Sequence, residues 1–252
     1  MLKLATKQDL DAIIDFCDGD LLGTRISCYC LSYGFERDFL GIWIDESDGR
    51  ISCVISKFYD SVTVVSKSES IYEIRDFINM IGYRNLEMNL GTCQKLGFKA
   101  SSVKKAYVFT GTTESLGAES LAEEYYRQLY NLVSKNISGS FSDSEEAYLS
   151  FLSDFTFRKR RLLARCKGFV ENNKLVSSVI TAAESDSSAL LSAVASDIGV
   201  RGKGYGKKTV LTMVDELLKE KKKVFVIALN ESAESFYEHI GFSFCEEIAF
   251  IK

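Results

Sequence analysis

The sequence predicts an α/β protein whose mixed sheet carries helices on both faces. Two observations lead to this prediction. Short apolar runs that suit buried strands alternate with segments whose apolar residues recur every three or four positions, as in helices. The order of these elements in the first half of the chain is repeated in the second, and a polar, glycine-containing stretch at 112–118 separates the halves. We therefore expect two tandem units, residues 1–112 and 113–252.

The first unit is expected to hold two helices and six strands. The helices are predicted over 7–16 and 71–81, and the strands over 2–5, 39–45, 51–58, 62–65, 85–89 and 103–110. Between Val65 and Ile71 the chain reads Ser-Lys-Ser-Glu-Ser, with no glycine. The first unit is therefore predicted to lack a glycine-rich turn at this point.

Two helices are expected at the start of the second unit. Apolar residues follow one helical face from Leu121 to Val133. The stretch Ser142–Glu145, Ser-Asp-Ser-Glu, has the form of a capping box before a second helix that runs to Phe155.

Strands and helices alternate in the rest of the second unit. The predicted strands are 163–171, 175–183, 189–195 and 223–229, and the predicted tight turn between the first two is Asn172-Asn173. A helix with apolar residues from Val210 to Leu218 lies between the third and fourth strands, and a further helix and strand follow the fourth.

A glycine-rich turn joins the predicted strand 189–195 to the helix after it. Gly202, Gly204 and Gly206 can adopt positive φ and place no Cβ beside the backbone, so N–H groups can converge on an anion at the positive end of the helix. Four basic residues add charge of the right sign: Arg201, Lys203, Lys207 and Lys208. The stretch is typical of a phosphate-binding loop.

The spacing excludes two common phosphate loops. A Walker A loop would need a glycine where Arg201 stands and a hydroxyl residue after Lys207. The dinucleotide fingerprint, started at Gly202, has Lys207 in place of its third glycine. The pattern that fits is Arg-x-x-Gly-x-Gly, at Arg201, Gly204 and Gly206. It resembles the acetyl-CoA pyrophosphate loop of the GNAT (GCN5-related) N-acetyltransferases.

A second motif strengthens this resemblance. Residues 230–242 read Asn-Glu-Ser-Ala-Glu-Ser-Phe-Tyr-Glu-His-Ile-Gly-Phe, similar to the family's Asn…Ala…Phe-Tyr-x-x-x-Gly-Phe. The resemblance covers residues 163–252 and implies the acyl-CoA N-acyltransferase (GNAT) fold. Residues 93–98, Cys-Gln-Lys-Leu-Gly-Phe, match the spacing of 237–242. The first unit therefore resembles a degenerate copy of the fold, with Cys93 where the tyrosine would stand.

The resemblance implies roles for individual residues. Acetyl-CoA would be the co-substrate, and Asn230 would border it. The strand end and glycine loop that would hold it comprise Val194, Ala195, Ser196, Arg201, Gly202, Lys203, Gly204, Tyr205, Gly206 and Lys207. Tyr237 would be the general acid for the departing thiolate. A phenol with a pKa of about 10 and a thiol with a pKa of about 8.5 exchange a proton at little free-energy cost, which suits this role. The alternative is that Tyr237 only packs in the core.

The general base is less well marked. Glu184, directly after the predicted strand 175–183, is the candidate, and the alternative is that Glu184 and Asp186 are turn carboxylates in water. His239 is interpreted as a packing or surface residue. The basic run 158–161 would either attract an acidic substrate or form a solvated helix end.

Composition narrows the kinds of partner, compartment and cysteine chemistry that the protein can have. The net charge of −4 argues against nucleic acid as the main partner. No apolar run approaches the roughly 20 residues of a membrane span, and the first ten residues do not read as a signal peptide, so we expect no membrane partner and a cytoplasmic protein. Seven cysteines without a framework spacing and a single histidine favour buried thiols over disulfides or a metal site.

The predicted function is N-acetyl transfer from acetyl-CoA to a primary amine by direct attack. The amine could belong to a small molecule or to a peptide, and the protein could be a monomer or a homodimer. A non-catalytic acyl-CoA-binding regulatory module is the alternative function. A third possibility is that the loop holds another phosphate ligand.

Overall fold

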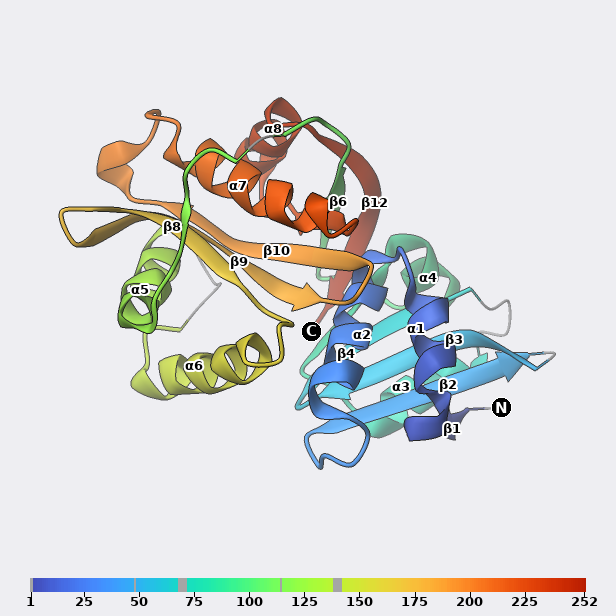
Figure 1. Cartoon of the computed structure of the whole chain (residues 1–252). Coiled ribbons are helices and arrows are strands. Elements are labelled where there is room, and N and C mark those ends of the chain that lie inside the picture. The colour runs from blue at the N-terminus through green and yellow to red at the C-terminus, as the bar shows by residue number, and fades with distance from the viewer. Residues whose placement is uncertain (1, 48, 68–71, 114, 138–141) are drawn as a thin grey trace. The chain divides into compact units, whose positions relative to one another are not determined.

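The structure is a computed structural model that divides the chain into two compact units. The residues it describes are 2–47, 49–67, 72–113, 115–137 and 142–252 (Figure 1). The first unit comprises Met1–Tyr107, Ile227–Ser235 and Phe244–Lys252. The second comprises Val108–Val226 and Phe236–Ser243. These units are defined by contacts and not by where one repeat of the fold ends, so the predicted boundary at residue 112 stays a prediction.

The sheet of the first unit combines strands from the two ends of the sequence. In spatial order it contains β1 (Lys3–Leu4), β2 (Leu40–Ser47), β3 (Arg50–Phe58), β4 (Ser61–Ser66), β5 (Asn85–Asn89) and β12 (Phe242–Ile251), and next to β12 lies β6 (Ser102–Phe109). Neighbours from β1 to β4 are antiparallel, and β4 and β5 are parallel. Residues Ile248–Ile251 of β12 pair antiparallel with Leu86–Asn89 of β5. A segment near residue 250 therefore completes a sheet that begins at residue 3.

Helices cover both faces of this first sheet. They are α1 (Leu10–Cys17), α2 (Leu21–Tyr33), α3 (Tyr72–Ile81) and α4 (Leu90–Lys95), with the 3-10 turn η1 (Lys7–Asp9) before α1. In Figure 1, α1 and α2 lie in front of the sheet and α3 behind it. Ile74 and Ile78 of α3 and Cys93 of α4 pack in one buried cluster with Ile55 and Val64 of the strands. The predicted layering is confirmed for this unit.

Helix α2 is an element that apolar periodicity missed. Nine of its thirteen residues are buried, and they include Gly23, Thr24 and Ser27. Because small and polar residues are buried around most of its surface, the contrast between an apolar and a polar face is weak. A cap marks its start, since the Asp20 carboxylate accepts a hydrogen bond from the Gly23 N–H at 2.7 Å.

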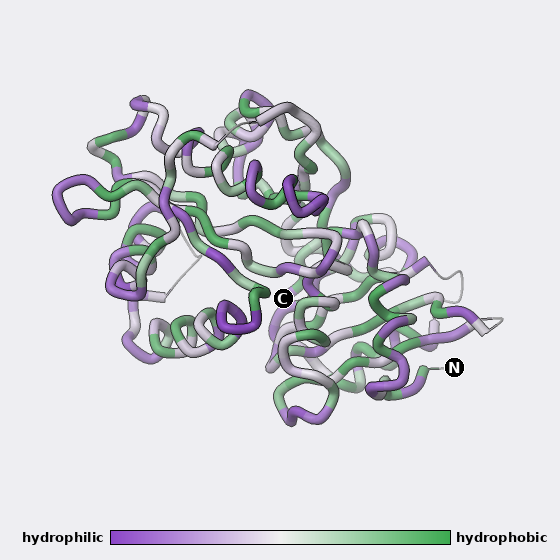
Figure 2. The backbone as a smooth tube through the Cα atoms, viewed as in Figure 1, coloured by the Kyte–Doolittle hydropathy of each residue, from purple (hydrophilic) through white to green (hydrophobic). Residues whose placement is uncertain are grey.

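The second unit has a sheet of five strands in the order β11-β10-β9-β8-β7. Their bounds are β7 (Glu119–Ser120), β8 (Cys166–Glu171), β9 (Lys174–Glu184), β10 (Ser188–Ser196) and β11 (Lys223–Ile227). The pairs are antiparallel except for β10 and β11, which are parallel. Asn172 and Asn173 have φ of 49° and 61°, as a two-residue type I′ turn requires, so this prediction is confirmed. Figure 2 shows this turn as a hydrophilic tip between more hydrophobic strands.

Helices lie on both faces of the second sheet as well. The helices of this unit are α5 (Tyr126–Asn136), α6 (Glu145–Lys159), α7 (Tyr205–Lys219) and, from Phe236 onward, the end of α8 (Glu231–His239), with 3-10 turns η2 (Glu123–Tyr125) and η3 (Ile198–Val200). Ile180 packs in a cluster with Leu129 of α5, whereas Ser177 hydrogen-bonds Thr209 of α7 at 2.9 Å. Residues 177 and 180 point to opposite faces of β9, so α5 and α7 cover opposite faces.

The predicted capping box is wrong by two residues. The N-cap of α6 is Ser144, whose hydroxyl accepts from the Ala147 N–H at 3.2 Å. Glu145 does not reach back to a cap at Ser142, because both of its carboxylate oxygens hold Arg127 at 2.6 and 2.7 Å.

Among the described residues, no helix combines the length and apolar composition that crossing a bilayer needs.

Candidate active site

The glycine loop opens the N-terminus of α7 to an anion. Gly202 and Gly204 have φ of 80° and 83°, and Gly204 is the left-handed N-cap of the helix. The first helical hydrogen bond runs from the Lys208 N–H to the Gly204 carbonyl at 3.0 Å, so the N–H groups of Tyr205, Gly206 and Lys207 have no acceptor within the helix. A Cβ built on Gly202 or Gly204 would meet nothing within 4 Å. The loop is therefore an open cradle that a phosphate group fits.

Gly206 serves close packing. A Cβ on this residue would lie 3.1 Å from the Ser196 hydroxyl oxygen and 3.8 Å from the Phe236 ring. The absent side chain lets the first turn of α7 approach both the end of β10 and helix α8. The cradle, the strand end and the residue beside Tyr237 are thereby brought together in the second unit.

The hairpin between β8 and β9 holds the loop at both ends. At the start, Asp197 accepts from the Gly199 N–H at 2.9 Å and forms an ion pair with Lys174 at 2.6 Å. Lys174 and the Gly199 N–H hold the pKa of Asp197 below its usual range. At the end, the Tyr205 hydroxyl donates to Glu171. These side-chain contacts fix the loop before any ligand arrives.

The basic residues of the loop are divided between two settings. The Arg201 guanidinium donates to the Asn136 side-chain carbonyl at 3.0 Å, at the end of α5. Lys203, Lys207 and Lys208 are exposed around the opening of the cradle. The lysines therefore supply the free positive charge, whereas Arg201 anchors the loop.

A β-bulge interrupts β10 just before the loop. Ser192 is opposite Ile180, but the next described pair is Ala195 with Ser178, so three steps on β10 match two on β9. Ala193 has φ of 51°, and its carbonyl accepts from the Ser178 hydroxyl at 3.1 Å. A bulge leaves backbone groups out of the regular ladder, and bulges are frequent beside active sites.

The other edge of β10 is open over the same stretch. Its pairing with β11 runs from Ser188–Lys223 to Leu191–Val226, while β10 continues to Ser196. Backbone N–H and C=O groups beyond Leu191 are therefore available to a ligand on this edge. The predicted contact residues Val194, Ala195 and Ser196 lie on it, and the strand leads directly into the cradle.

Comparison with known proteins supports the resemblance that the two motifs predicted. Residues 167–251 match the family model described as FR47-like protein. No curated protein matches the sequence. A GNAT-family acetyltransferase from Colwellia psychrerythraea is similar over 99% of this chain and 98% of its own, with 12% identity and a TM-score of 0.60.

Two further solved structures are similar over nearly the whole chain. A tandem GNAT protein from the clavulanic acid biosynthesis pathway matches 99% of this chain and 97% of its own, with 11% identity and a TM-score of 0.62. A Drosophila protein matches 99% and 98%, with 13% identity and a TM-score of 0.64. The chain has the GNAT fold.

Tyr237 of the GNAT motif is a buried phenol. Its side chain is 6% exposed and packs between Phe236 and Phe242, with ring centroids 5.3 and 5.5 Å away. Burial raises the pKa of Tyr237, so the hydroxyl stays protonated at neutral pH. The group can donate a proton or a hydrogen bond but cannot serve as a base.

Gly241 of the same motif has φ of 103°, and its carbonyl oxygen accepts hydrogen bonds from the N–H groups of Thr110 and Gly111 at 3.0 Å each.

Asn230 of the same GNAT motif caps α8. Its side-chain carbonyl accepts from the Ala233 N–H at 2.9 Å, which satisfies a donor at the start of the helix. Its predicted contact with acetyl-CoA stays a prediction.

Glu184 lies in an ion cluster. It is fully buried, Arg165 binds both of its oxygens at 2.9 and 2.7 Å, and the Thr181 hydroxyl and Lys222 ammonium donate at 2.7 and 2.9 Å. It is paired with Ala189, five residues before Val194, which at 3.3 Å per residue is about 16 Å along the strand. These contacts give Glu184 a structural role in the GNAT sheet, and its role as the base stays a prediction.

We expect Glu184→Gln to destabilise the protein by about 2 kcal/mol, because the change removes the fully buried carboxylate that half-buried Arg165 and buried Lys222 share, while Glu220 still pairs with both. Denaturant unfolding checks this value. Turnover, measured where the variant is fully folded, decides the base prediction. A loss of 10²-fold or more supports that prediction, and unchanged turnover contradicts it.

The structure also decides between the alternatives left open for His239 and for the basic run. His239 ends α8 and is exposed, so it is a surface residue and not a packing residue. The basic run is divided: Arg158 is 6% exposed and donates to the Ala182 carbonyl at 2.7 Å, whereas Arg160 and Arg161 are exposed. Only the last two could attract an acidic substrate.

Over the residues that the structure describes, the first unit shows no counterpart of the bulge in β10. The β3–β4 ladder is regular from Cys53–Ser66 to Phe58–Ser61, without a bulge. The parallel β4–β5 ladder has four pairs, as many as the β10–β11 ladder, but β4 continues for only two residues beyond it, whereas β10 continues for five. Residues 68–71, where a cofactor loop is predicted to be missing, lie outside the described residues. The interpretation of this unit as a degenerate GNAT copy stays a prediction.

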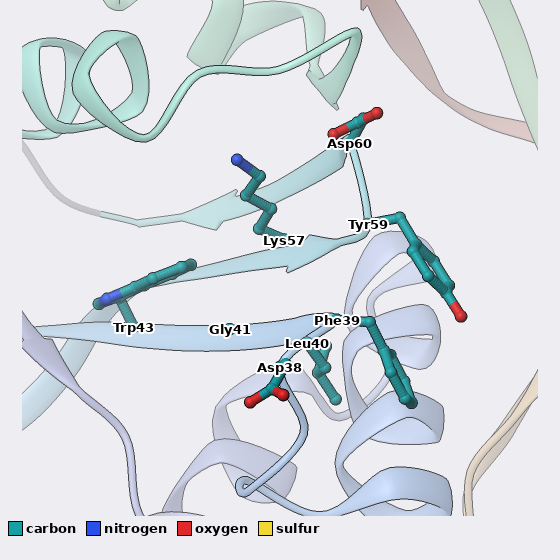
Figure 3. A pocket seen from close by; sticks show the side chains of 8 residues that line it. All are labelled: Asp38, Phe39, Leu40, Gly41, Trp43, Lys57, Tyr59 and Asp60. Carbon is teal, nitrogen blue, oxygen red and sulfur yellow. The ribbon is translucent and has the colours of Figure 1, made fainter.

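A surface hollow of about 640 Å³ also lies in the first unit. Figure 3 shows its side chains diverging, with Asp38 and Asp60 on opposite sides and the rings of Phe39 and Tyr59 together at one end. The Lys57 ammonium donates to the Ile81 carbonyl at 2.5 Å, and the two rings stack 5.2 Å apart. Because its polar groups do not converge on one point, the hollow does not have the form of a catalytic site.

Proposed function

We propose that the protein is an N-acetyltransferase that transfers the acetyl group of acetyl-CoA to a primary amine. The observation that carries the proposal is the continuous path in the second unit from the open edge of β10 to the cradle of α7. A thioester on the strand edge and a pyrophosphate at the helix N-terminus would be held by adjoining residues. The GNAT fold of the chain supports this reading.

The binding roles follow from the donors that each segment offers. The N–H groups of Tyr205, Gly206 and Lys207 suit the pyrophosphate oxygens, and the exposed lysines suit the remaining phosphate charge. Backbone groups of Val194–Ser196 suit the pantetheine amides and the thioester carbonyl. Backbone donors in a fixed strand need no reorganisation as negative charge develops on the carbonyl oxygen.

The reaction requires two proton movements. The lone pair of a neutral primary amine attacks the thioester carbonyl carbon, a C–N bond forms, and the C–S bond then breaks. Tyr237 protonates the departing sulfur and regains a proton from solvent. The amine nitrogen loses one proton, and Glu184 is the base that the sequence predicts for this step. The products are an N-acetylated amine and free CoA.

The burial of Tyr237 favours a second candidate function. A phenol that is 6% exposed has little contact with solvent, as would suit a core aromatic residue. In that case the loop would bind acyl-CoA without transfer, and the protein would be a regulatory module. Amine-dependent release of CoA separates the two candidates.

The test is a thermal-shift titration followed by an assay of thiol release. Acetyl-CoA, ATP and NAD are titrated separately, because a ligand that binds only the folded state raises the melting temperature. Release of CoA is then measured with spermidine, kanamycin, glycine, a peptide with a free N-terminus and a lysine peptide. Cys245 is an exposed thiol, so protein without acetyl-CoA is the blank.

Each result selects one reading. Stabilisation by acetyl-CoA with release for one amine supports the enzyme and names its acceptor class. Stabilisation without release for any amine supports the regulatory module. Stabilisation by ATP or NAD but not by acetyl-CoA contradicts both.

A further inference from the structure

Ser192 is an exposed residue in the middle of a strand whose other residues are buried or half-buried. Its neighbours Leu191 and Ala193 are 2% and 5% exposed, whereas Ser192 is open to solvent. The strand is internal to its sheet, between β9 and β11. Ser192 is therefore the one fully exposed residue of β10, with Val194 and Ser196 half-buried beyond it.

The register shows which face Ser192 occupies. Ser192 is paired with Ile180, and paired residues of neighbouring strands point to the same face. Ile180 packs in the cluster with α5, so the Ser192 hydroxyl lies on the α5 face. The α7 helix, which carries the cradle, covers the opposite face through Ser177 and Thr209.

Along β10, Ser192 lies between the end of the pairing with β11 and the start of the bulge. Leu191, one residue earlier, makes the last described pair with β11, and the bulge begins one residue later. Val194 begins the stretch whose backbone is proposed to bind the pantetheine amides and the thioester carbonyl, and it is two residues away, or about 7 Å along the strand. An acceptor that attacks this carbonyl from the α5 face would have Ser192 beside it.

The hydroxyl of Ser192 is available. Within the described part of the chain it makes no hydrogen bond, unlike the nearby Ser177, Ser178 and Ser196, whose hydroxyls are all bonded to neighbours. A serine hydroxyl can accept as well as donate. It also carries no charge, so it can hold an amine without favouring the ammonium form, as a carboxylate would.

We propose that the Ser192 hydroxyl oxygen binds the acceptor by accepting a hydrogen bond from the N–H of the neutral primary amine. The inference rests on the proposed function and assigns the acceptor side of that site to the α5 face of β10. Ser192 would orient the nitrogen lone pair toward the carbonyl held at the bulge. No bond is made to the serine during the reaction.

Kinetics of Ser192→Ala, Ser192→Thr and the wild type test the proposal, with the amine that reacts best in the panel above. Ser153→Ala is the matched control, because Ser153 is an exposed serine on α6 of the same unit. We expect Ser192→Ala to raise the KM for the amine about five- to tenfold, as expected for loss of one hydrogen bond. The Kd for acetyl-CoA and the Tm should stay unchanged, and Ser192→Thr should recover most of the loss.

The outcomes are distinct. An unchanged KM for the amine in Ser192→Ala overturns the role of Ser192. A loss of acetyl-CoA affinity as large as the rise in the amine KM overturns it as well. In both cases, turnover by the wild type would still support the acetyltransferase function. Absence of amine-dependent turnover in the wild type overturns the proposed function, and the acceptor site with it. A raised KM in Ser192→Thr equal to that in Ser192→Ala would also contradict a role for the hydroxyl.

Discussion

Gly204→Glu is expected to abolish acetyl-CoA binding. A Cβ on Gly204 would stand in open space at the N-cap of α7, so a glutamate there would bring its carboxylate to the helix N-terminus where the pyrophosphate is proposed to lie. Two like charges 4 Å apart repel by about 4 kcal/mol at an effective dielectric constant of about 20, which is about a thousandfold in affinity. Isothermal titration with acetyl-CoA measures the loss.

Two control variants separate charge from backbone strain. Gly204→Gln has the same size without the charge, and we expect it to weaken binding less than Gly204→Glu. Gly117 has φ of 84°, close to that of Gly204, and a Cβ there also meets nothing within 4 Å. Gly117→Glu carries the same strain away from the loop and should leave affinity unchanged. Equal affinity for Gly204→Glu and the wild type would mean that the phosphates bind elsewhere.

Tyr237→Phe should leave acetyl-CoA binding intact and reduce kcat by roughly 10²- to 10⁴-fold, the range typical of one acid-base group. The ring keeps its contacts with Phe236 and Phe242, so only the hydroxyl is removed. Thiol release at saturating acetyl-CoA measures the change. Tyr130→Phe is a suitable control, because it removes another tyrosine hydroxyl from the same unit, one that donates to the Ser142 carbonyl at 2.7 Å. Equal kcat in Tyr237→Phe and the wild type would rule out the acid role.

The pH profile gives an independent check on Tyr237. A general acid works only while protonated, so its contribution is lost as pH rises through its pKa. Burial raises the pKa of Tyr237 above the ordinary value of about 10 for tyrosine, so kcat should show no alkaline decline from this group between pH 7 and 10. A decline below pH 9 that is present in the wild type and absent in Tyr237→Phe would contradict this expectation.

Elements with strong local signals could be predicted from the sequence. The strand β5 has the bounds that its apolar run predicts, and Asn172-Asn173 forms the expected turn. Helix α2 could not be found in this way, because its sides are buried nearly all round and its serine, threonine and glycine residues give no apolar stripe. The α6 cap lies at Ser144, and Glu145, predicted to complete the box, instead binds Arg127, eighteen residues earlier.

In the candidate site too, features set by single residues could be predicted from the sequence, and features set by strand register could not. Glycine spacing alone located the cradle, because positive φ and a missing Cβ are properties of single residues. The bulge at Ala193 and the exposure of Ser192 depend on strand register, which the sequence does not state. The ion cluster around Glu184 joins residues 165, 184 and 222, which only the folded sheet brings together. Contacts between distant residues thus account for most of what sequence reasoning missed.

The pairing of β12 with β5 has a consequence for synthesis of the chain on the ribosome. Leu86–Asn89 are translated early, but their partner Ile248–Ile251 follows only after more than 150 further residues. Until then, one edge of β5 lacks this neighbour, and Leu86 and Met88, buried in the finished protein, belong to that strand. Unpaired strand edges attract other chains during folding. The sheet of the first unit is therefore completed only after the last strand of the chain has been made.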